Sequence, residues 1–223
     1  MPLPRFERLP ADRQEHFLAV ARRHFADYGA EAASYNKIIE ATGFSKTAAY
    51  QYFDGRDDLL GAVLDGVRER LLGALGPWRP AGRAEEFWAR LDQGSKALVT
   101  HLYAHADDLA LADASLAHAG DGQWIGWFGA VVDNGRQLGV VRPDIDRELL
   151  VAATAAVFRA ADAWALAALR ETEAGGSAPA ADGGGDGEEQ VWSLLRGLWT
   201  APGGTAPGGG GGSASGEGGG RAG

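Results

Sequence analysis

The sequence predicts an all-α protein in which a small N-terminal three-helix domain is followed by a larger helical body. Three observations support this fold class. Apolar residues recur at spacings of three and four along most of the chain, which is the period of an amphipathic helix. No alternating pattern of a β-strand competes with them. Glycine and proline breaks divide the chain into helix-length units, and two short units meet at Gly43 like a helix-turn-helix.

The first predicted helix covers residues 11–28. One of its faces carries apolar and aromatic residues at helical spacing: Phe17, Val20, Ala21, Phe25 and Tyr28. We expect this face to support the two short helices that follow.

Residues 34–53, SYNKIIEATGFSKTAAYQYF, contain these two short helices and the turn between them. Ser34 is a suitable N-cap, whose hydroxyl can accept a backbone N–H of the first helix. Gly43 can adopt the positive φ that ends this helix, and Ser45 is expected to cap the second. The second helix presents an outward set that suits a DNA groove: Lys46, Thr47, Tyr50 and Gln51.

This segment and its neighbours resemble the DNA-binding domain of the tetracycline-repressor (TetR) family. FLAVARRHFADYGAEAAS, residues 17–34, is similar to the family's first helix and its passage into the second. YQYFDGRDDLL, residues 50–60, resembles the family signature Y-x-[YH]-F-x-x-[KR]-x-x-L. The resemblance implies a homodimeric transcriptional regulator, most often a repressor, that binds a palindromic operator in double-stranded DNA and whose body binds a small ligand.

The predicted DNA contacts lie in and around the two short helices. Lys46, Tyr50 and Arg56 are predicted to bind phosphates, the role of Arg56 being implied by the resemblance. Thr47 and Gln51 are better placed for base edges. The complete predicted set is Ser34, Tyr35, Asn36, Ser45, Lys46, Thr47, Tyr50, Gln51, Tyr52 and Arg56.

The net charge of −9 by itself argues against a nucleic-acid partner. The distribution of the charges along the chain removes this objection. Residues 1–60 hold eight Lys and Arg against nine Asp and Glu, a net of −1, whereas the remaining chain holds 13 against 21, a net of −8. The acidity therefore lies mostly outside the predicted DNA-binding domain. We expect a modest phosphate contribution to affinity, and therefore dependence on dimerisation.

The body is predicted to begin with a long helix over residues 57–75 that joins it to the first domain and acts as a lever. Further helices are expected at 85–105, 107–118, 122–138, 146–171 and 188–200. The predicted domains are thus residues 1–56 and 57–200. Two low-complexity segments complete the chain, a flexible loop at 174–187 and a disordered Gly-rich tail at 201–223.

The last two predicted helices resemble the family's dimer interface, a four-helix bundle across a two-fold axis. The residues assigned to it are Leu150, Val157, Ala161, Leu194 and Leu198. The alternative, in which this stripe packs inside one protomer, stays open.

The body also holds all seven tryptophans of the chain. Buried indole N–H groups need partners, whereas indoles around a cavity give flat stacking walls, so we expect a site for a small hydrophobic or aromatic ligand. Its predicted lining is Trp88, Asp92, Tyr103, Trp124, Trp127, Phe128 and Trp164. Acids at the edge, among Asp92, Asp107, Asp113 and Asp162, would favour a cationic compound. Ordinary core packing explains the aromatic residues equally well.

The sequence offers little support for other functions. It has no cysteine and no catalytic motif, so we predict neither an enzyme nor a cofactor. His101 and His105, followed by Asp108, could bind a metal at their i, i+4 spacing, but we assign no metal site. No apolar stretch suggests a membrane span, and a cytoplasmic protein is expected. The alternatives are an activator, a regulator without a ligand, and a helical enzyme or binding module.

Overall fold

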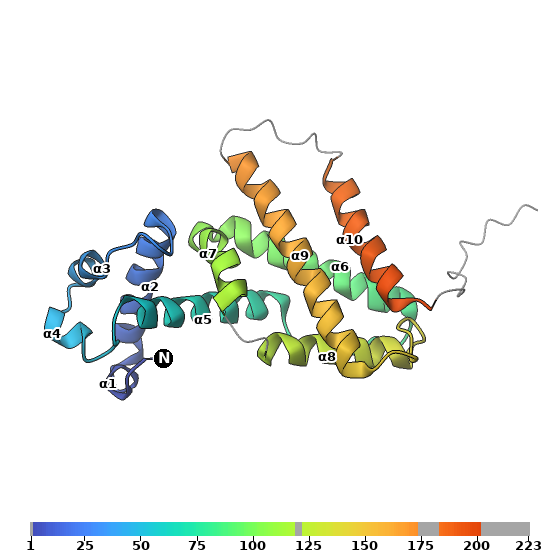
Figure 1. Ribbon diagram of the computed structural model, residues 1–223, viewed down its shortest axis with the longest axis horizontal. Coiled ribbons are helices and arrows are strands. Elements are labelled where there is room, and N and C mark those ends of the chain that lie inside the picture. The colour runs from blue at the N-terminus through green and yellow to red at the C-terminus, as the bar shows by residue number, and fades with distance from the viewer. Residues whose placement is uncertain (1, 119–121, 174–182, 202–223) are drawn as a thin grey trace, which may run out of the picture.

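The computed structural model describes residues 2–118, 122–173 and 183–201, and over these ranges it is helical without strands (Figure 1). The helices are α1 (Pro4–Glu7), α2 (Ala11–Tyr28), α3 (Tyr35–Thr42), α4 (Lys46–Ala49), α5 (Arg56–Leu75), α6 (Ala84–Ala104), α7 (Ala106–His118), α8 (Gly122–Gln137), α9 (Arg147–Glu173) and α10 (Gly183–Trp199). The all-α prediction is confirmed. The predicted tail from 202 onward and the loop residues 174–182 lie outside the described residues.

Three elements differ from the sequence prediction. Helix α4 ends at Ala49, so Tyr50 and Gln51, expected on this helix, follow it. The short helix α1 was not predicted, and it packs Phe6 against Phe17 and Phe53 with ring centroids 6.0 and 4.8 Å apart. Helix α10 begins at Gly183 instead of at residue 188, so the predicted loop is shorter. Its first turns are rich in glycine, which gives no periodic signal for a helix.

Helices α2 to α4 form a head at one end of the molecule, and α5 runs from this head into the body (Figure 1). Gly55 and Gly76 bound α5, and Gly76 has a φ of 74°, which favours glycine over other residues. The negative charges of Asp57 and Asp58 in the first turn stabilise the helix, because they lie at the positive end of its dipole. Its apolar face is buried through Leu59, Val63, Leu64, Val67 and Leu71.

Two hydrophobic cores hold the chain together. One joins the head to α5 and α7, through residues such as Phe25, Val67 and Leu111. The other lies between α6, α8, α9 and α10, and Trp124 packs against both cores. Because α7 packs on both α2 and α5, the core of the head continues past residue 56 into the body. The predicted boundary between residues 56 and 57 therefore falls inside a continuous core.

Buried polar contacts fix the far end of the body. Trp199 donates its indole N–H to Thr154 Oγ1 at 2.9 Å, and both side chains are fully buried. Asn134 bonds both the N–H and the carbonyl of Ala81, which ties the segment after α5 to α8. These paired donors and acceptors avoid the cost of burying unsatisfied polar groups.

Candidate nucleic-acid interface

The turn between α3 and α4 has the predicted helix-turn-helix geometry. Gly43 takes the left-handed conformation at a φ of 73°. Phe44 packs edge-on against Phe17 at 5.2 Å, and Ser45 caps α4 by accepting the Ala48 N–H at 3.2 Å. Ser34 stands at the N-cap position of α3, but its side chain makes no capping bond, which corrects the prediction for its hydroxyl.

Seven of the ten predicted DNA-binding residues are exposed at the helix-turn-helix. They are Ser34, Asn36, Ser45, Lys46, Thr47, Tyr50 and Gln51. Lys37 is exposed on the same segment, and neither it nor Lys46 forms an ion pair with another described residue. The surface therefore offers two unpaired positive charges and several neutral hydrogen-bonding groups, which is a composition suited to phosphates and base edges.

The other three predicted residues point into the head. Tyr35 donates its hydroxyl to the Ala49 and Phe53 carbonyls, and Tyr52 is buried among the phenylalanines. Burial raises the pKa of Tyr35 to about 12, helped by nearby Tyr50 and Asp58, so its hydroxyl stays protonated as a donor. Both tyrosines thus hold α3 and α4 in place.

Arg56 is the third inward residue. Its Nε donates to the Ala33 carbonyl at 2.9 Å and a second nitrogen donates to Ala30. The guanidinium also pairs with Asp57 at 2.7 Å and lies over the Phe25 ring. These contacts fix the α2–α3 connection to the start of α5. A phosphate contact by Arg56 stays a prediction.

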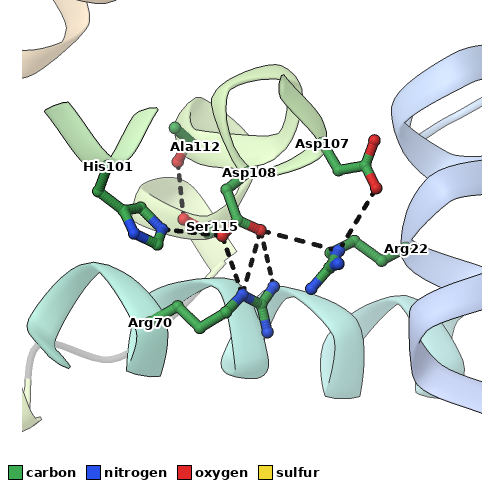
Figure 2. A network of polar contacts seen from close by, with 7 residues as sticks. All are labelled: Arg22, Arg70, His101, Asp107, Asp108, Ala112 and Ser115. Atoms are coloured by element: carbon green, nitrogen blue, oxygen red, sulfur yellow. Dashed lines mark hydrogen bonds and ion pairs between the residues drawn. The ribbon is translucent and has the colours of Figure 1, made fainter. Parts of the chain in front are cut away.

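A buried carboxylate connects the head to the body (Figure 2). Asp108 on α7 is 1% exposed and accepts hydrogen bonds from Arg70 of α5 at 2.7 to 3.2 Å. His101 Nε2 of α6 lies 3.0 Å from the same carboxylate, and Arg22 Nε of α2 lies 3.8 Å from it. Arg22 also pairs with Asp107 at 3.6 Å. Side chains from four helices therefore meet at Asp108.

The sequence suggested His101, His105 and Asp108 only as a possible metal site. His101 does contact Asp108, and the two histidine rings are 4.3 Å apart. However, Arg70 binds the same carboxylate, and a fixed guanidinium charge opposes a cation there. Among the described residues, no group of three or more metal-binding side chains is found.

The structure does not gather the predicted ligand-binding residues around one cavity. Tyr103 and Trp164 are 63% and 55% exposed, and Asp92 pairs with Lys96 at 2.8 Å. Trp88 packs against Trp192 and Trp199, in the core between α6 and α10. The remaining three form one aromatic face of α8: Trp124, Trp127 and Phe128. The side chain of Asp162 lies outside the described residues.

A pocket of about 450 Å³ lies beside this aromatic face, at the C-terminal end of α5. Of the predicted ligand-binding set it contains Trp127, which donates its indole N–H to the Gly76 carbonyl at 3.0 Å. Trp78 also lines it. Sequence reasoning missed Trp78 because it stands in a proline-flanked segment outside the helical pattern.

The predicted dimer residues divide between the inside and the outside of the protomer. Leu150 is fully buried in the body core, and Val157 packs against that core. Both therefore pack inside one protomer, which is the alternative that the sequence left open. Ala161 and Leu198 are half-buried. Leu194 is 64% exposed. Helix α9 instead exposes a stripe of small and apolar residues that was not predicted: Leu149, Ala152, Ala156, Ala160, Ala163 and Ala167.

Residues 17–63 match a family model described as bacterial regulatory proteins, tetR family. No curated protein matches this chain in sequence. Among the described residues, no helix is both long and apolar enough to cross a membrane.

Several solved structures resemble the whole chain at low identity. A putative tetR family transcription regulator from Shewanella sp. PV-4 is 14% identical, with a TM-score of 0.60 over 85% of this chain and 99% of its own. A tetR family regulator from Pseudomonas syringae pv. tomato DC3000 is 18% identical, with a TM-score of 0.55 over 87% and 100%. One from Chloroflexus aurantiacus J-10-FL is 21% identical, with a TM-score of 0.53 over 88% and 98%. These likenesses extend the shared fold to the body.

Proposed function

We propose that this chain, a transcriptional regulator of the tetR family, is a homodimeric repressor that binds a palindromic operator and releases it when a small apolar or aromatic ligand binds the body. The observation that carries the proposal is the exposed polar surface of the helix-turn-helix, which α5 connects to a body with its own core. No catalytic group is needed for this function, because binding energies alone shift the protein between DNA-bound and free states.

The DNA-reading part of the proposal rests on the exposed row on α4 and the turn after it. Lys46 and Tyr50 are placed for phosphates, while Thr47 and Gln51 are placed for base edges. A helix-turn-helix reads the major groove with its second helix. Because one short helix offers few contacts, we infer that specific affinity requires two heads on one duplex.

The dimer part of the proposal rests on the exposed faces of α9 and α10. The stripe from Leu149 to Ala167 repeats at helical spacing, and its alanines let a second helix approach closely. On α10, exposed Leu194 lies one turn before Gly197, where an added Cβ would meet nothing within 4 Å. A second copy of the same two helices would bury both faces across a two-fold axis.

The release part of the proposal rests on Asp108. This carboxylate connects the head, through Arg22, to α5 and α6, through Arg70 and His101 (Figure 2). A ligand that moves α6 or α7 would therefore move α2 and α5 with them. Two heads must keep a spacing of about 34 Å to reach successive major grooves, so a small rotation of each weakens operator binding.

Two experiments test the proposal. Selection of bound duplexes from random double-stranded DNA should give a palindrome with two half-sites. Transcription in vitro from a promoter that overlaps this palindrome should then fall as the protein is added. Enrichment of no sequence would reject specific DNA reading, and an increase in transcript would identify an activator instead.

A further inference from the structure

We propose that the pocket at the C-terminal end of α5 binds an amphipathic anion, a flat apolar body that carries a carboxylate. This inference deepens the proposed function and rests on it, since it names the chemical class of the ligand. It reverses the cationic ligand expected from the acidic residues of the body.

The walls of the pocket come from four segments that meet at one place. They are the end of α5 with Leu75, the connection with Pro77 and Trp78, the middle of α6 with Gly94, and Trp127 of α8. The volume of about 450 Å³ falls in the range of pockets for small organic ligands. Two indoles, nearly perpendicular to each other, and a leucine provide apolar walls against which an aromatic ring can pack.

The charges at this pocket are positive. Both of its charged lining residues are arginines, Arg79 and Arg90, and no acid lines it. Arg90 is held by Glu86 and by the Arg79 and Pro80 carbonyls, so part of its charge is neutralised. Arg79 is exposed and forms no ion pair with another described residue. A carboxylate at the mouth of the pocket would therefore find a free guanidinium donor in Arg79.

Two of the four acids that the sequence offered for a cation are paired elsewhere. Asp92 binds Lys96 at 2.8 Å, and Asp107 lies 3.6 Å from Arg22. In a chain with a net charge of −9, a pocket whose charged side chains are both arginines is a local exception. Electrostatic complementarity of this kind selects the sign of the ligand more than it adds affinity.

The pocket also touches the helix that leads to the head. Trp127 donates to the carbonyl of Gly76, the residue that ends α5. Leu75 lies so close to α6 that a Cβ on Gly94 would be 2.8 Å from its Cδ1. A ligand that enters beside Trp127 would therefore contact the end of α5 directly, through Leu75 and Gly76.

The test uses two probes with the same ring system and opposite charge, 2-naphthoate and 2-naphthylmethylammonium. Their affinities for the full-length protein are measured by isothermal titration calorimetry. We expect 2-naphthoate to bind at least tenfold more tightly. Arg79→Gln should remove most of this preference, while Arg83→Gln, an exposed arginine that does not line the pocket, should leave it unchanged. Ala97→Leu, which adds bulk to the lining, should weaken 2-naphthoate at least tenfold.

Three results would overturn the inference: no binding of 2-naphthoate at millimolar concentration, equal or tighter binding of the cation, or equal effects of Arg79→Gln and Arg83→Gln. Binding of the selected operator is measured in parallel for each variant. If operator binding is normal and 2-naphthoate does not bind, the ligand class is wrong and the DNA-binding function stands. If 2-naphthoate binds and no operator is found, the proposed function fails independently.

Discussion

Arg70 on α5 donates two hydrogen bonds to the carboxylate of Asp108 on α7, from Nη2 at 2.7 Å and from Nε at 2.9 Å. The carboxylate is almost completely buried. Such a two-point contact fixes the orientation of both side chains and not only their distance. Because Arg22 and His101 approach the same carboxylate, this point links the head to the body in addition to the shared hydrophobic core (Figure 2).

Replacing Asp108 with Asn should destabilise the fold by about 1.5–3 kcal/mol, because it weakens the hydrogen bonds to Arg70, whose guanidinium is partly exposed. Urea unfolding measures this loss. Asp107→Asn is the matched control, since Asp107 is partly exposed and contacts Arg22 at 3.6 Å, and its cost should stay below about 1 kcal/mol. Equal losses of unfolding free energy for the two variants would show that the buried Asp108 stabilises the fold no more than the partly exposed Asp107.

The stability contributed by Asp108 should also depend on pH. Burial alone would raise the pKa of its carboxyl, but the hydrogen bonds from Arg70 and His101 and the charges of Arg70 and Arg22 outweigh it, so the pKa lies below the ordinary 3.8. The unfolded chain therefore takes up the proton first. The contribution is complete above about pH 3.8 and is lost as the pH falls through the lower folded value.

Urea midpoints of the wild type and Asp108→Asn between pH 6 and pH 2 test this dependence. The difference between the two proteins should be constant at the upper end and should shrink below the ordinary pKa of an aspartate. If the difference in urea midpoint between the two proteins is the same at pH 2 as at pH 6, the charge of Asp108 does not stabilise the fold.

The exposed residues of α4 and of the turn after it should divide into two functional classes. Lys46→Ala should weaken all duplexes alike and reduce the salt dependence of log K by about one unit, as expected for one lost phosphate contact. Gln51→Ala should cost about 1–3 kcal/mol on the selected operator and relax one position in each half-site.

Repeating the sequence selection with both variants and with Gln137→Ala, an exposed glutamine at the end of α8, separates the classes. Gln137→Ala should change nothing. If Gln51→Ala leaves the selected motif unaltered, Gln51 does not read a base.

The exposed stripe on α9 should form the dimer interface. A glutamate at Ala156 would place a charge in the middle of a close helix contact, where its desolvation is costly. Ala156→Glu should therefore give monomers in sedimentation velocity. Ala89→Glu, on an exposed face of α6, is the control and should stay dimeric. Dimers of Ala156→Glu at micromolar concentration would place the interface on another surface.

The helices were predictable from sequence because their apolar periodicity and their Gly and Pro breaks are local signals. The predicted 11–28 and 57–75 segments agree with α2 and α5 to within one residue at each end. The helix-turn-helix was equally accessible, since Gly43 and Ser45 have local conformational requirements.

The faces of those helices were less predictable. Leu149 and Leu150 are adjacent, so the sequence of α9 supports two apolar stripes, and the position of α8 and α10 decides which one is buried. The role of Asp108 as a buried ion-pair partner was missed for a related reason. Its partners come from three other helices, and nothing local in the sequence of α7 distinguishes a buried aspartate from a solvated one.

We expect two heads, held together by one interface between the bodies, to bind one palindrome together. The most direct test is the affinity of the full-length protein for the selected operator, compared with the same duplex after one half-site is scrambled. We predict a loss of at least a hundredfold, about 2.7 kcal/mol, and a complex of two protomers on the intact site. Equal affinity for the two duplexes, with one protomer on each, would contradict it.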